Sequence, residues 1–437
     1  MSVASLRARA RELFEAGIAA ADPAAAVRKS LAERPVRADR VIAFGKAAVP
    51  MGLAALEHCP GAPLLIVTNR ENADATLSHG VRLMVAGHPV PDEDGEVAAR
   101  EVEAFATGAG EGETVLVLVS GGGSAMLPAP AEGLTLADKV AVTEALLASG
   151  APIDEVNAVR RALSRLKGGG LARAIHPART VALLLSDVPR DDIRAIASGP
   201  TIPERRTRED AERALDVLTR HVEPERRSPR AVAVLLDAVS APDRPDKLPE
   251  VENRLVGGNG VSLDAMARRI ADEGAEATIV SRWLDGDVAD AAATMYRSAV
   301  EAGATDAVLL AGGETTVVLR GTGRGGRNQE MALRFALLAD ASPLPRDWAF
   351  LSGGTDGRDG PTETAGGLVD PGTIARMRAA GADPEALLAN NDSHAALAAS
   401  GDLQMTGGTG TNVADLQVLL LGPRRSAGMD GDGPSGA

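Results

Sequence analysis

The chain has 437 residues, about three times the length of a typical single domain, so two domains are expected. Apolar residues make up 45% and charged residues 24%, a globular composition that excludes disorder along the whole chain. The 60 acidic and 46 basic residues give a net charge of −14, which disfavours binding to nucleic acid or to an anionic membrane surface. An anionic substrate therefore has to be captured locally, by a few aimed groups.

A single cysteine, Cys59, excludes intramolecular disulfides and cysteine-based zinc sites. No stretch of about 18 consecutive apolar residues occurs, and residues 1–21 carry charges at amphipathic spacing instead of a continuous apolar segment. These features predict a cytoplasmic protein.

Short apolar runs rich in Val, Leu and Ile recur in the first half of the chain, with helical stretches between them. Because the runs are apolar without alternation, they indicate strands covered on both faces, as in a parallel sheet between helices. A helix over 137–149 is marked by a Thr135–Asp138 capping signal and by Gly150 after its end. The predicted strands are 40–44, 64–68, 81–86, 114–120 and 180–186.

A polar segment with three prolines, 241–250, has the composition of a stiff exposed connection. We place the domain boundary there, between a first domain at 1–240 and a second at 241–425, and expect a disordered tail at 426–437. The second domain is predicted to be a second α/β series. Its expected strands are 254–256, 277–280, 307–310, 316–319, 348–351 and 416–421, and its expected helices lie near 262–271, 288–302, 328–338 and 371–379.

The strongest candidate for a binding loop follows the predicted strand 114–120 and consists of Ser120, Gly121, Gly122, Gly123 and Ser124. Ligands of open α/β sheets bind at the carboxyl ends of strands. Three glycines allow positive φ and leave backbone N–H groups uncovered, so the loop can wrap an anion, although a tight turn without function would use the same residues. A P-loop kinase is excluded, because no GxxxxGK[ST] motif occurs.

Candidate cations lie near other glycines. Lys46 follows the strand 40–44 in a chain with 41 Arg and 5 Lys, which indicates a compact charge there, with a snorkelling surface lysine as the alternative. Arg324 and Arg327 flank glycines, so one of them can clamp a phosphate or a carboxylate. Arg327 has the better-fixed geometry, because it starts a predicted helix.

A literal GxGxxG motif occurs at Gly321, Gly323 and Gly326. It is a weak match to a dinucleotide-binding loop, since no ribose-binding acid follows about 20 residues on. We interpret it as a mobile loop that faces an anion.

Acidic residues follow apolar strands at Asp187, Asp356 and Asp359. An Asp at such a place can hold Mg²⁺ through water or accept a substrate proton, although Asp also closes ordinary turns. His88 lies between turn residues and is interpreted as structural. No Ser-His-Asp or HExxH pattern stands out, which disfavours a hydrolase or a zinc enzyme.

Taken in order, these motifs resemble the glycerate 2-kinases that carry a C-terminal MOFRL domain, a group often labelled hydroxypyruvate reductase. The resemblance runs from about residue 5 to residue 422. It rests on FGKAA, GHPVPDEDG, VSGGGSAMLPAP, NAVRRALSRLKGGGLA, LLSDVPRDD with ASGPT, GGNG, AGGETTV, GRNQE, GGTDGRDGPT, NNDSH and GGTGTNVADL.

The resemblance implies phosphorylation of D-glycerate at its 2-hydroxyl by ATP, with Mg²⁺, giving 2-phosphoglycerate and ADP. It also implies an N-terminal Rossmann-like domain, a C-terminal MOFRL-type domain and an active site in the cleft between them. The Lys of FGKAA and the Arg of GRNQE are expected at the catalytic centre; here they are Lys46 and Arg327. Asp187 is expected beside them.

Further binding residues are expected within the same motifs, with Asp187 and Asp356 as metal ligands through water. They are Ser120, Gly121, Gly122, Gly123, Ser124, Asn157, Gly257, Gly258, Asn259, Arg324 and Asp356. SDVPRDD departs from the family in having Arg190 where many members carry glycine. The resemblance leaves open whether the Gly121–Ser124 loop holds nucleotide phosphate or glycerate carboxylate, and whether the chain forms a homo-oligomer.

Two competing functions are an NAD(P)H-dependent hydroxypyruvate reductase and a non-enzymatic two-domain sensor of small acids. The reductase is motivated by the family label and by GxGxxG. The missing ribose-binding acid speaks against it, and the charged loops at several strand ends exceed what a sensor needs.

Overall fold

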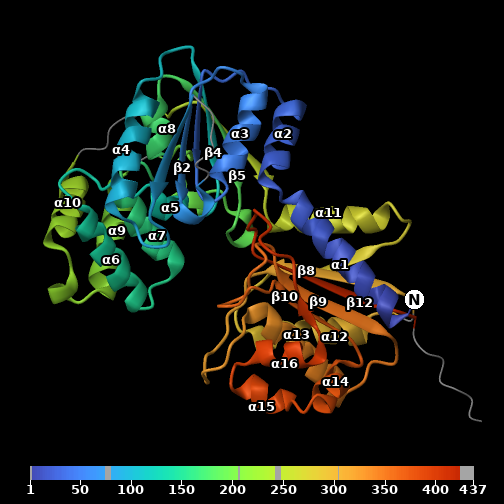
Figure 1. The fold of residues 1–437 in the computed structure, drawn as a ribbon. Helices are drawn as coiled ribbons and strands as arrows, with labels where there is room; N and C mark the ends of the chain where they lie inside the picture. Colours follow the sequence, from blue (N-terminus) through green and yellow to red (C-terminus); the bar gives the residue numbers. More distant parts are fainter. Residues whose placement is uncertain (1, 74–79, 205–206, 242–247, 304, 424–437) are drawn as a thin grey trace, which may run out of the picture. The chain divides into compact units, whose positions relative to one another are not determined.

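The computed structural model describes residues 2–73, 80–204, 207–241, 248–303 and 305–423. Contacts divide the chain into two compact units, Ala21–Gly258 and Met1–Ala20 with Asn259–Ala437. Each unit is built on one six-stranded sheet with helices on both faces (Figure 1). The predicted two α/β domains are thereby confirmed.

The sheet of the Ala21–Gly258 unit is parallel throughout and has the order β3-β2-β1-β4-β5-β6. This is the strand order of a dinucleotide-type Rossmann sheet, in which the direction of winding reverses between β1 and β4. The strands are β1 (Arg40–Phe44), β2 (Leu64–Asn69), β3 (Val81–Ala86), β4 (Thr114–Val119), β5 (Arg179–Leu185) and β6 (Val251–Gly257).

The strand expected at 254–256 exists as β6, but its assignment to the second domain was wrong. It pairs in parallel with β5, with Leu183 opposite Arg254. Parallel neighbours in a sheet are joined by a long crossover, and the helices between β5 and β6 form that crossover here. The sequence analysis grouped β6 with the strands that follow it because it is closer to them along the chain. The compact units divide after Gly258; the domain boundary at residue 240 stays a prediction, and residues 242–247 of the expected connector lie outside the described residues.

Helices α2 and α3 lie on one face of this sheet, and α4 and α8 lie on the other (Figure 1). Helices α6, α7, α9 and α10 share a separate apolar core. The helices are α2 (Pro23–Glu33), α3 (Ala48–His58), α4 (Glu93–Thr107), α5 (Gly123–Met126), α6 (Leu136–Ala148), α7 (Ile153–Ala162), α8 (Gly170–Ile175), α9 (Arg208–His221) and α10 (Pro229–Ser240), with single 3₁₀ turns η1 (Arg70–Asn72), η2 (Pro189–Asp191), η3 (Ile196–Ser198) and η4 (Pro224–Arg226).

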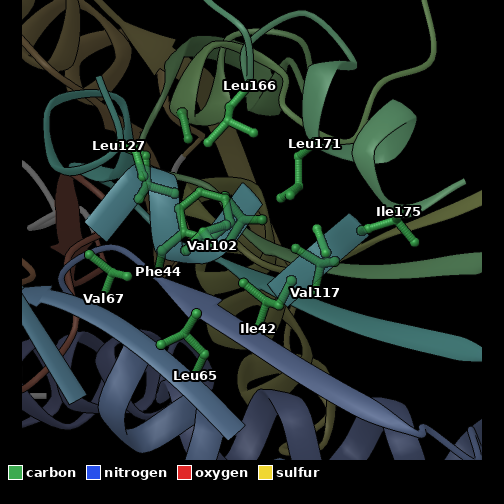
Figure 2. Close-up of a cluster of buried hydrophobic side chains, with 14 of the residues drawn as sticks. Ile42, Phe44, Leu65, Val67, Val102, Val117, Leu127, Leu166, Leu171 and Ile175 are labelled. Carbon is green, nitrogen blue, oxygen red and sulfur yellow. The ribbon is translucent and has the colours of Figure 1, made fainter. Parts of the chain in front are cut away.

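The start of α6 confirms the capping prediction: the Thr135 side chain accepts from the Asp138 N–H, and the Asp138 carboxylate accepts from the Thr135 N–H. The core beneath the sheet follows from the apolar runs of the strands. Alternate residues of β1, β2 and β4 point into it and meet α4 and α8 (Figure 2). Its labelled members include Ile42, Phe44, Leu65, Val67, Val102, Val117, Leu171 and Ile175.

The second sheet has the order β11-β10-β9-β12-β8-β7. Only β7 and β8 pair in parallel; β12 runs antiparallel to both β8 and β9. The strands are β7 (Ala277–Leu284), β8 (Ala307–Gly313), β9 (Trp348–Gly354), β10 (Gly366–Val369), β11 (Leu403–Gln404) and β12 (Asp415–Leu421).

The strand expected at 316–319 is wrong, since Thr316 makes only an isolated bridge to Asp287. Val318 and Leu319 are exposed and lie beside no neighbouring strand, so an apolar run alone did not specify a buried one. Strands β10 and β11 were not predicted, because they are short and rich in residues other than Val and Ile.

Helix α1 (Val3–Ala20) packs on α11, β9 and β12, which are all more than 200 residues away from it in the sequence. Gly17 admits Leu416, and Gly353 admits the ring of Phe14, since a Cβ at either glycine would lie within 2.7 Å of these side chains. The other helices of this unit are α11 (Asn259–Ala271), α12 (Val288–Glu301), α13 (Arg327–Ala341), α14 (Thr373–Ala379), α15 (Pro384–Ala389) and α16 (Ser393–Ser400).

Among the described residues, no helix has both the length and the apolar character that crossing a membrane requires. The predicted disordered tail, 426–437, lies outside the described residues.

Candidate functional site

The first group of candidate residues lies where the winding of the parallel sheet reverses. Lys46 follows β1, and the loop from Ser120 to Ser124 follows β4. The Lys46 N–H donates to the Gly121 carbonyl at 2.9 Å, and the Ala47 N–H donates to Ser120 Oγ at 3.0 Å. Gly45 has φ +116°, and a Cβ there would lie 2.3 Å from Ser120 Oγ. Hydrogen bonds thus hold the segments FGKAA and SGGGS together between β1 and β4, where the winding of the sheet reverses.

The glycine loop presents its backbone outward. Gly122, with φ +84°, leads into the short helix α5. The N–H groups of residues 121–124 donate to no protein group among the described residues, which is the condition for a backbone anion site. Lys46 likewise forms no side-chain hydrogen bond or ion pair with a described residue. The structure therefore brings a cation and a set of N–H donors to one sheet edge.

Asp187 belongs to the same place. It follows β5, and a Cβ on Gly121 would lie only 1.9 Å from Asp187 Oδ2. His88, interpreted from sequence as structural, also lies beside the loop, since a Cβ on Gly122 would be 3.1 Å from its ring. Burial and the charge of Lys46 lower the pKa of His88, against the opposing charge of Glu71. The imidazole next to the loop is therefore held in its neutral form.

The end of β6 completes this edge. The Ser186 N–H donates to the Gly257 carbonyl at 2.8 Å, and a Cβ on Gly258 would lie 2.4 Å from Asp191 Oδ1. Arg190, which lies between Ser186 and Asp191 in the chain, has φ +58°. A left-handed conformation favours glycine, so Arg190 takes a backbone conformation that L side chains rarely adopt.

Ser124 is bound by two cations that the sequence analysis did not single out. Its Oγ accepts from Arg160 Nη2 at 2.6 Å and from Lys167 Nζ at 2.7 Å. Asn157, which was predicted to bind substrate, accepts from Arg160 Nη1 at 3.2 Å. Both cations could have been found from the sequence, because NAVRRALSRLKGGG has several basic residues at short spacing, one of them among the few lysines of the chain. Asn157 thus positions Arg160. Lys139 lines the same cavity as Arg160 and Lys167.

The second group lies in the other unit, around Arg327 at the first residue of α13. Its Nε and Nη2 donate to Asp415 Oδ2 and Oδ1 at 2.6 and 3.0 Å, and its Nη1 lies 3.0 Å from Glu314 Oε1. Asp415 starts β12 and pairs with Gly313 and Gly354, the ends of β8 and β9. The sequence analysis missed Asp415 and Glu314, although both stand in glycine-rich motifs at the ends of apolar strands.

The electrostatics of this pair follow from its burial. Burial raises the pKa of Asp415 to about 6, with the hydrogen bond and charge of Arg327 acting in the opposite direction. Burial also disfavours the charged form of Arg327, but its hydrogen bond with Asp415 and the charges of Asp415, Glu314 and Asp359 leave the pKa of Arg327 above its usual value. Arg327 is thus a fully charged guanidinium in a largely acidic environment.

The carboxylates of GGTDGRDG have two different roles. The Asp359 carboxylate accepts from the backbone N–H groups of Asn328 and Gln329 at 3.0 and 2.8 Å, and so caps α13. Burial raises its pKa. Asp356 is half-buried, accepts from the Arg358 N–H at 3.0 Å, and lies against Gly354.

Two predicted binding residues take other positions. Asn259 is buried, and its amide donates to the carbonyls of Val413 and Asp415 at 2.9 and 2.8 Å. It therefore fixes the start of β12. Arg324 is exposed and donates through Nη2 to the Pro361 carbonyl at 3.1 Å.

The interpretation of the GxGxxG segment as an anion-facing loop stays a prediction, but the N–H groups of its first part are bound by another segment. The N–H groups of Arg320 and Gly321 donate to Asn391 Oδ1 at 2.6 and 3.0 Å, and the Thr322 N–H donates to Asn390 Oδ1 at 3.2 Å. The next two N–H groups donate to the Asn390 carbonyl and to Asp392 Oδ1. These donors are used by the NNDSH segment, so they are not available to a ligand.

Comparisons with known proteins agree with this architecture. The model of the family described as "Domain of unknown function (DUF4147)" matches residues 9–237, and that of the MOFRL family matches residues 307–415. A crystal structure of a glycerate kinase from Thermotoga maritima superimposes with a TM-score of 0.86 at 38% identity, covering 95% of this chain and 99% of that one.

Full-length relatives carry two names. A D-glycerate 2-kinase of Thermotoga maritima is 39% identical over 95% of this chain and 99% of its own length, and a human glycerate kinase is 36% identical over 96% and 94%. An Agrobacterium vitis protein with the provisional name hydroxypyruvate reductase is 40% identical over 96% and 95%.

Proposed function

The chain belongs to the family of glycerate kinases with DUF4147 and MOFRL domains, and on this basis we propose that it transfers the γ-phosphoryl group of ATP to the 2-hydroxyl of D-glycerate. The products are 2-phosphoglycerate and ADP. The similarity to these kinases covers both domains and 99% of the length of the Thermotoga maritima protein.

One observation carries the proposal: Lys46 and the N–H groups of the glycine loop meet at the switch point of a Rossmann-ordered sheet. Phosphoryl transfer spreads negative charge over the equatorial oxygens, so catalysis consists of positioning and of electrostatic stabilisation by fixed cations and backbone donors. A lysine without a protein partner among the described residues, beside unused N–H groups, has the chemistry that this reaction demands.

Arg327 supplies the second cation in this proposal. Two of the five guanidinium N–H groups donate to Asp415, and Glu314 lies 3.0 Å from Nη1, which leaves N–H groups on Nη1 and Nη2 for a substrate oxygen. We propose that Lys46 and Arg327, one from each unit, act on the same transferring group in an interdomain cleft.

The nucleotide brings Mg²⁺ as its counter-ion in this proposal, and Asp187 and Asp356 are the carboxylates that would hold its water shell. The described residues contain no group of three or more His, Cys, Asp or Glu side chains placed to hold a metal. An ion bound mainly by phosphates and water needs no such group, and one or two carboxylates suffice. The ion would neutralise part of the charge of the triphosphate.

The turn after β1 does not support the alternative of an NAD(P)H-dependent reductase. In a Rossmann sheet the dinucleotide fingerprint occupies the turn after β1, and here that turn reads Gly45-Lys46-Ala47. The literal GxGxxG segment lies elsewhere, and the N–H groups from Gly321 to Arg324 bind the NNDSH segment.

The decisive experiment is turnover of purified protein with MgATP and a panel of short hydroxy acids, with the phosphorylated position assigned by phosphorus NMR. We expect D-glycerate to give 2-phosphoglycerate. A parallel assay with hydroxypyruvate and NADH should leave the absorbance of NADH unchanged; rapid oxidation of NADH without phosphoryl transfer would refute the kinase assignment.

A further inference from the structure

A cavity of about 260 Å³ lies within the Ala21–Gly258 unit, lined by α6, by Arg160 of α7, by Ser124 and by the segment Pro89–Pro91. Its deep part carries the buried side chains of Lys139 and Lys167. Its mouth is apolar: Leu136, Val140 and Leu147 lie on one face of α6, and Leu147 is 55% exposed. A cationic floor therefore lies beneath an apolar rim.

The protein groups bound by these cations are mostly neutral oxygens. Lys139 Nζ donates to the Pro128 carbonyl, Lys167 Nζ donates to the Ser124 carbonyl at 2.6 Å, and Arg160 donates to Ser124 Oγ. Among the described residues, no carboxylate forms an ion pair with Lys139 or Arg160. Glu144 lines only the exposed part of the cavity.

Burial and the basic groups around the cavity lower the pKa values of its two lysines. Burial, followed by the charges of Arg160 and Arg165, lowers the pKa of Lys139 to about 7. Burial, followed by the charges of Lys139 and Arg160, lowers the pKa of Lys167 well below its usual value. Keeping buried like charges together costs free energy, and a bound anion removes that cost. Such strained groups around a cavity are characteristic of a ligand site.

The cavity adjoins the glycine loop. Ser124 belongs to both, and Pro89 follows His88, whose ring lies against Gly122. An anion on the cavity floor would therefore lie at the Ser124 end of the glycine loop.

We propose that this cavity binds the carboxylate of the short hydroxy-acid acceptor, between Arg160, Lys139 and Lys167. The inference rests on the proposed function and deepens it, because it leaves the N–H groups of residues 121–123 to nucleotide phosphate. The adjacent 2-hydroxyl then lies on the Ser124 side. Most of the rim is apolar and offers additional hydroxyl groups few partners besides Thr143 and Glu144, so longer sugar acids are disfavoured.

The test is direct binding of D-glycerate to the intact protein without nucleotide, by titration calorimetry. Lys139→Met removes the charge but keeps an unbranched chain of similar length, and Arg160→Gln removes the guanidinium. Each should weaken glycerate binding tenfold or more and raise KM for the acid, with KM for ATP unchanged. Lys29→Met, the same substitution on the exposed face of α2, is the matched control and should bind normally.

Stability separates a binding role from a structural one. Replacing a buried charge by an apolar side chain is neutral or stabilising, so Lys139→Met should melt at or above the wild-type temperature while it loses affinity. Wild-type affinity for glycerate in both variants would overturn the proposal, as would displacement of glycerate by inorganic phosphate but not by lactate. Glycerol, which lacks the carboxylate, should not bind.

The two proposals can fail separately. If no hydroxy acid is phosphorylated, yet glycerate binds and the two variants weaken its binding, the kinase assignment is wrong and the carboxylate site stands. If glycerate is phosphorylated with an unchanged KM in both variants, only the carboxylate site is wrong.

Discussion

The backbone of Lys46 is held by the glycine loop, and its side chain is proposed to act on the substrate. Its N–H is bonded to Gly121, whereas its ammonium has no protein partner among the described residues. We expect Lys46→Ala to lower kcat by two orders of magnitude or more, since one lost donor to the transition state costs roughly 3–4 kcal/mol. Lys46→Arg should not restore activity, because a planar fork does not replace a compact charge. Steady-state kinetics, with Lys29→Ala as the control, measure both; turnover near the wild-type level would remove Lys46 from the reaction.

Arg327 has a structural role in addition to its proposed catalytic one. Truncation to Ala leaves the Asp415 carboxylate buried without its partner, so we expect the free energy of unfolding to fall by about 3 kcal/mol. Arg327→Met combined with Asp415→Asn should recover most of that stability but no activity. Urea denaturation and turnover, measured on the same samples, separate the two roles.

The control for this pair is Arg324→Ala, which removes an exposed arginine and should change stability by less than about 0.5 kcal/mol. An Arg327→Ala variant as stable as the wild type would contradict the ion pair with Asp415.

Gly121 keeps Asp187 in place by having no side chain. A Cβ there would lie 2.5 Å from Asp187 Cγ, so Gly121→Ala must displace this carboxylate. We expect a raised Mg²⁺ concentration for half-maximal rate, as for Asp187→Asn, with the fold retained, because only a side chain has to move. Gly110→Ala, where a Cβ meets nothing within 4 Å, is the control. An unchanged metal requirement in Gly121→Ala would remove Asp187 from metal binding.

At the scale of an element, α6 carries a buried lysine whose titration affects folding. The pKa of Lys139 is about 7 in the fold against 10.5 for an ordinary lysine, so the unfolded chain binds more protons between these values. The unliganded protein should therefore gain stability as pH rises from 7 towards 10.5, by roughly 2 kcal/mol between pH 7 and pH 9. Arg160, Arg165 and Lys167 face this ammonium, and Glu144 lies at the cavity rim.

The measurement is urea denaturation of wild type and Lys139→Met at both pH values. The difference between the two proteins isolates this group from the other titrating residues. The variant should lack the gain. Parallel pH dependences in the two proteins would show that Lys139 titrates as an ordinary lysine.

At the scale of the whole molecule, the proposed site needs both units. Lys46 belongs to the Ala21–Gly258 unit and Arg327 to the other, so a shared transferring group requires them to be brought together around the substrates. We expect the radius of gyration in small-angle scattering to fall when glycerate and a non-hydrolysable ATP analogue are added together. Identical curves from a saturated sample would argue against closure as part of the cycle.

The sequence by itself determined most of the central strands and the candidate residues around the glycine loop. Apolar runs specified the central strands, because a buried parallel strand needs no polar face, and the glycines after β1 and β4 marked the ligand edge. The recurrence of motifs in order identified Lys46, the Gly121–Ser124 loop, Asp187 and Arg327 as residues to examine. These are local properties, so they can be predicted without a fold.

Only the tertiary structure decided what depends on contacts between distant segments. Helix α1 joins the C-terminal sheet, β6 joins the edge of the N-terminal one, and the N–H groups from Gly321 to Arg324 are bound by NNDSH. Nothing nearby in the sequence indicates these partners. The same holds for Asp415 beside Arg327 and for the cations around Ser124. Burial and charge at these places arise from segments brought together by folding, and the residues within one segment do not determine them.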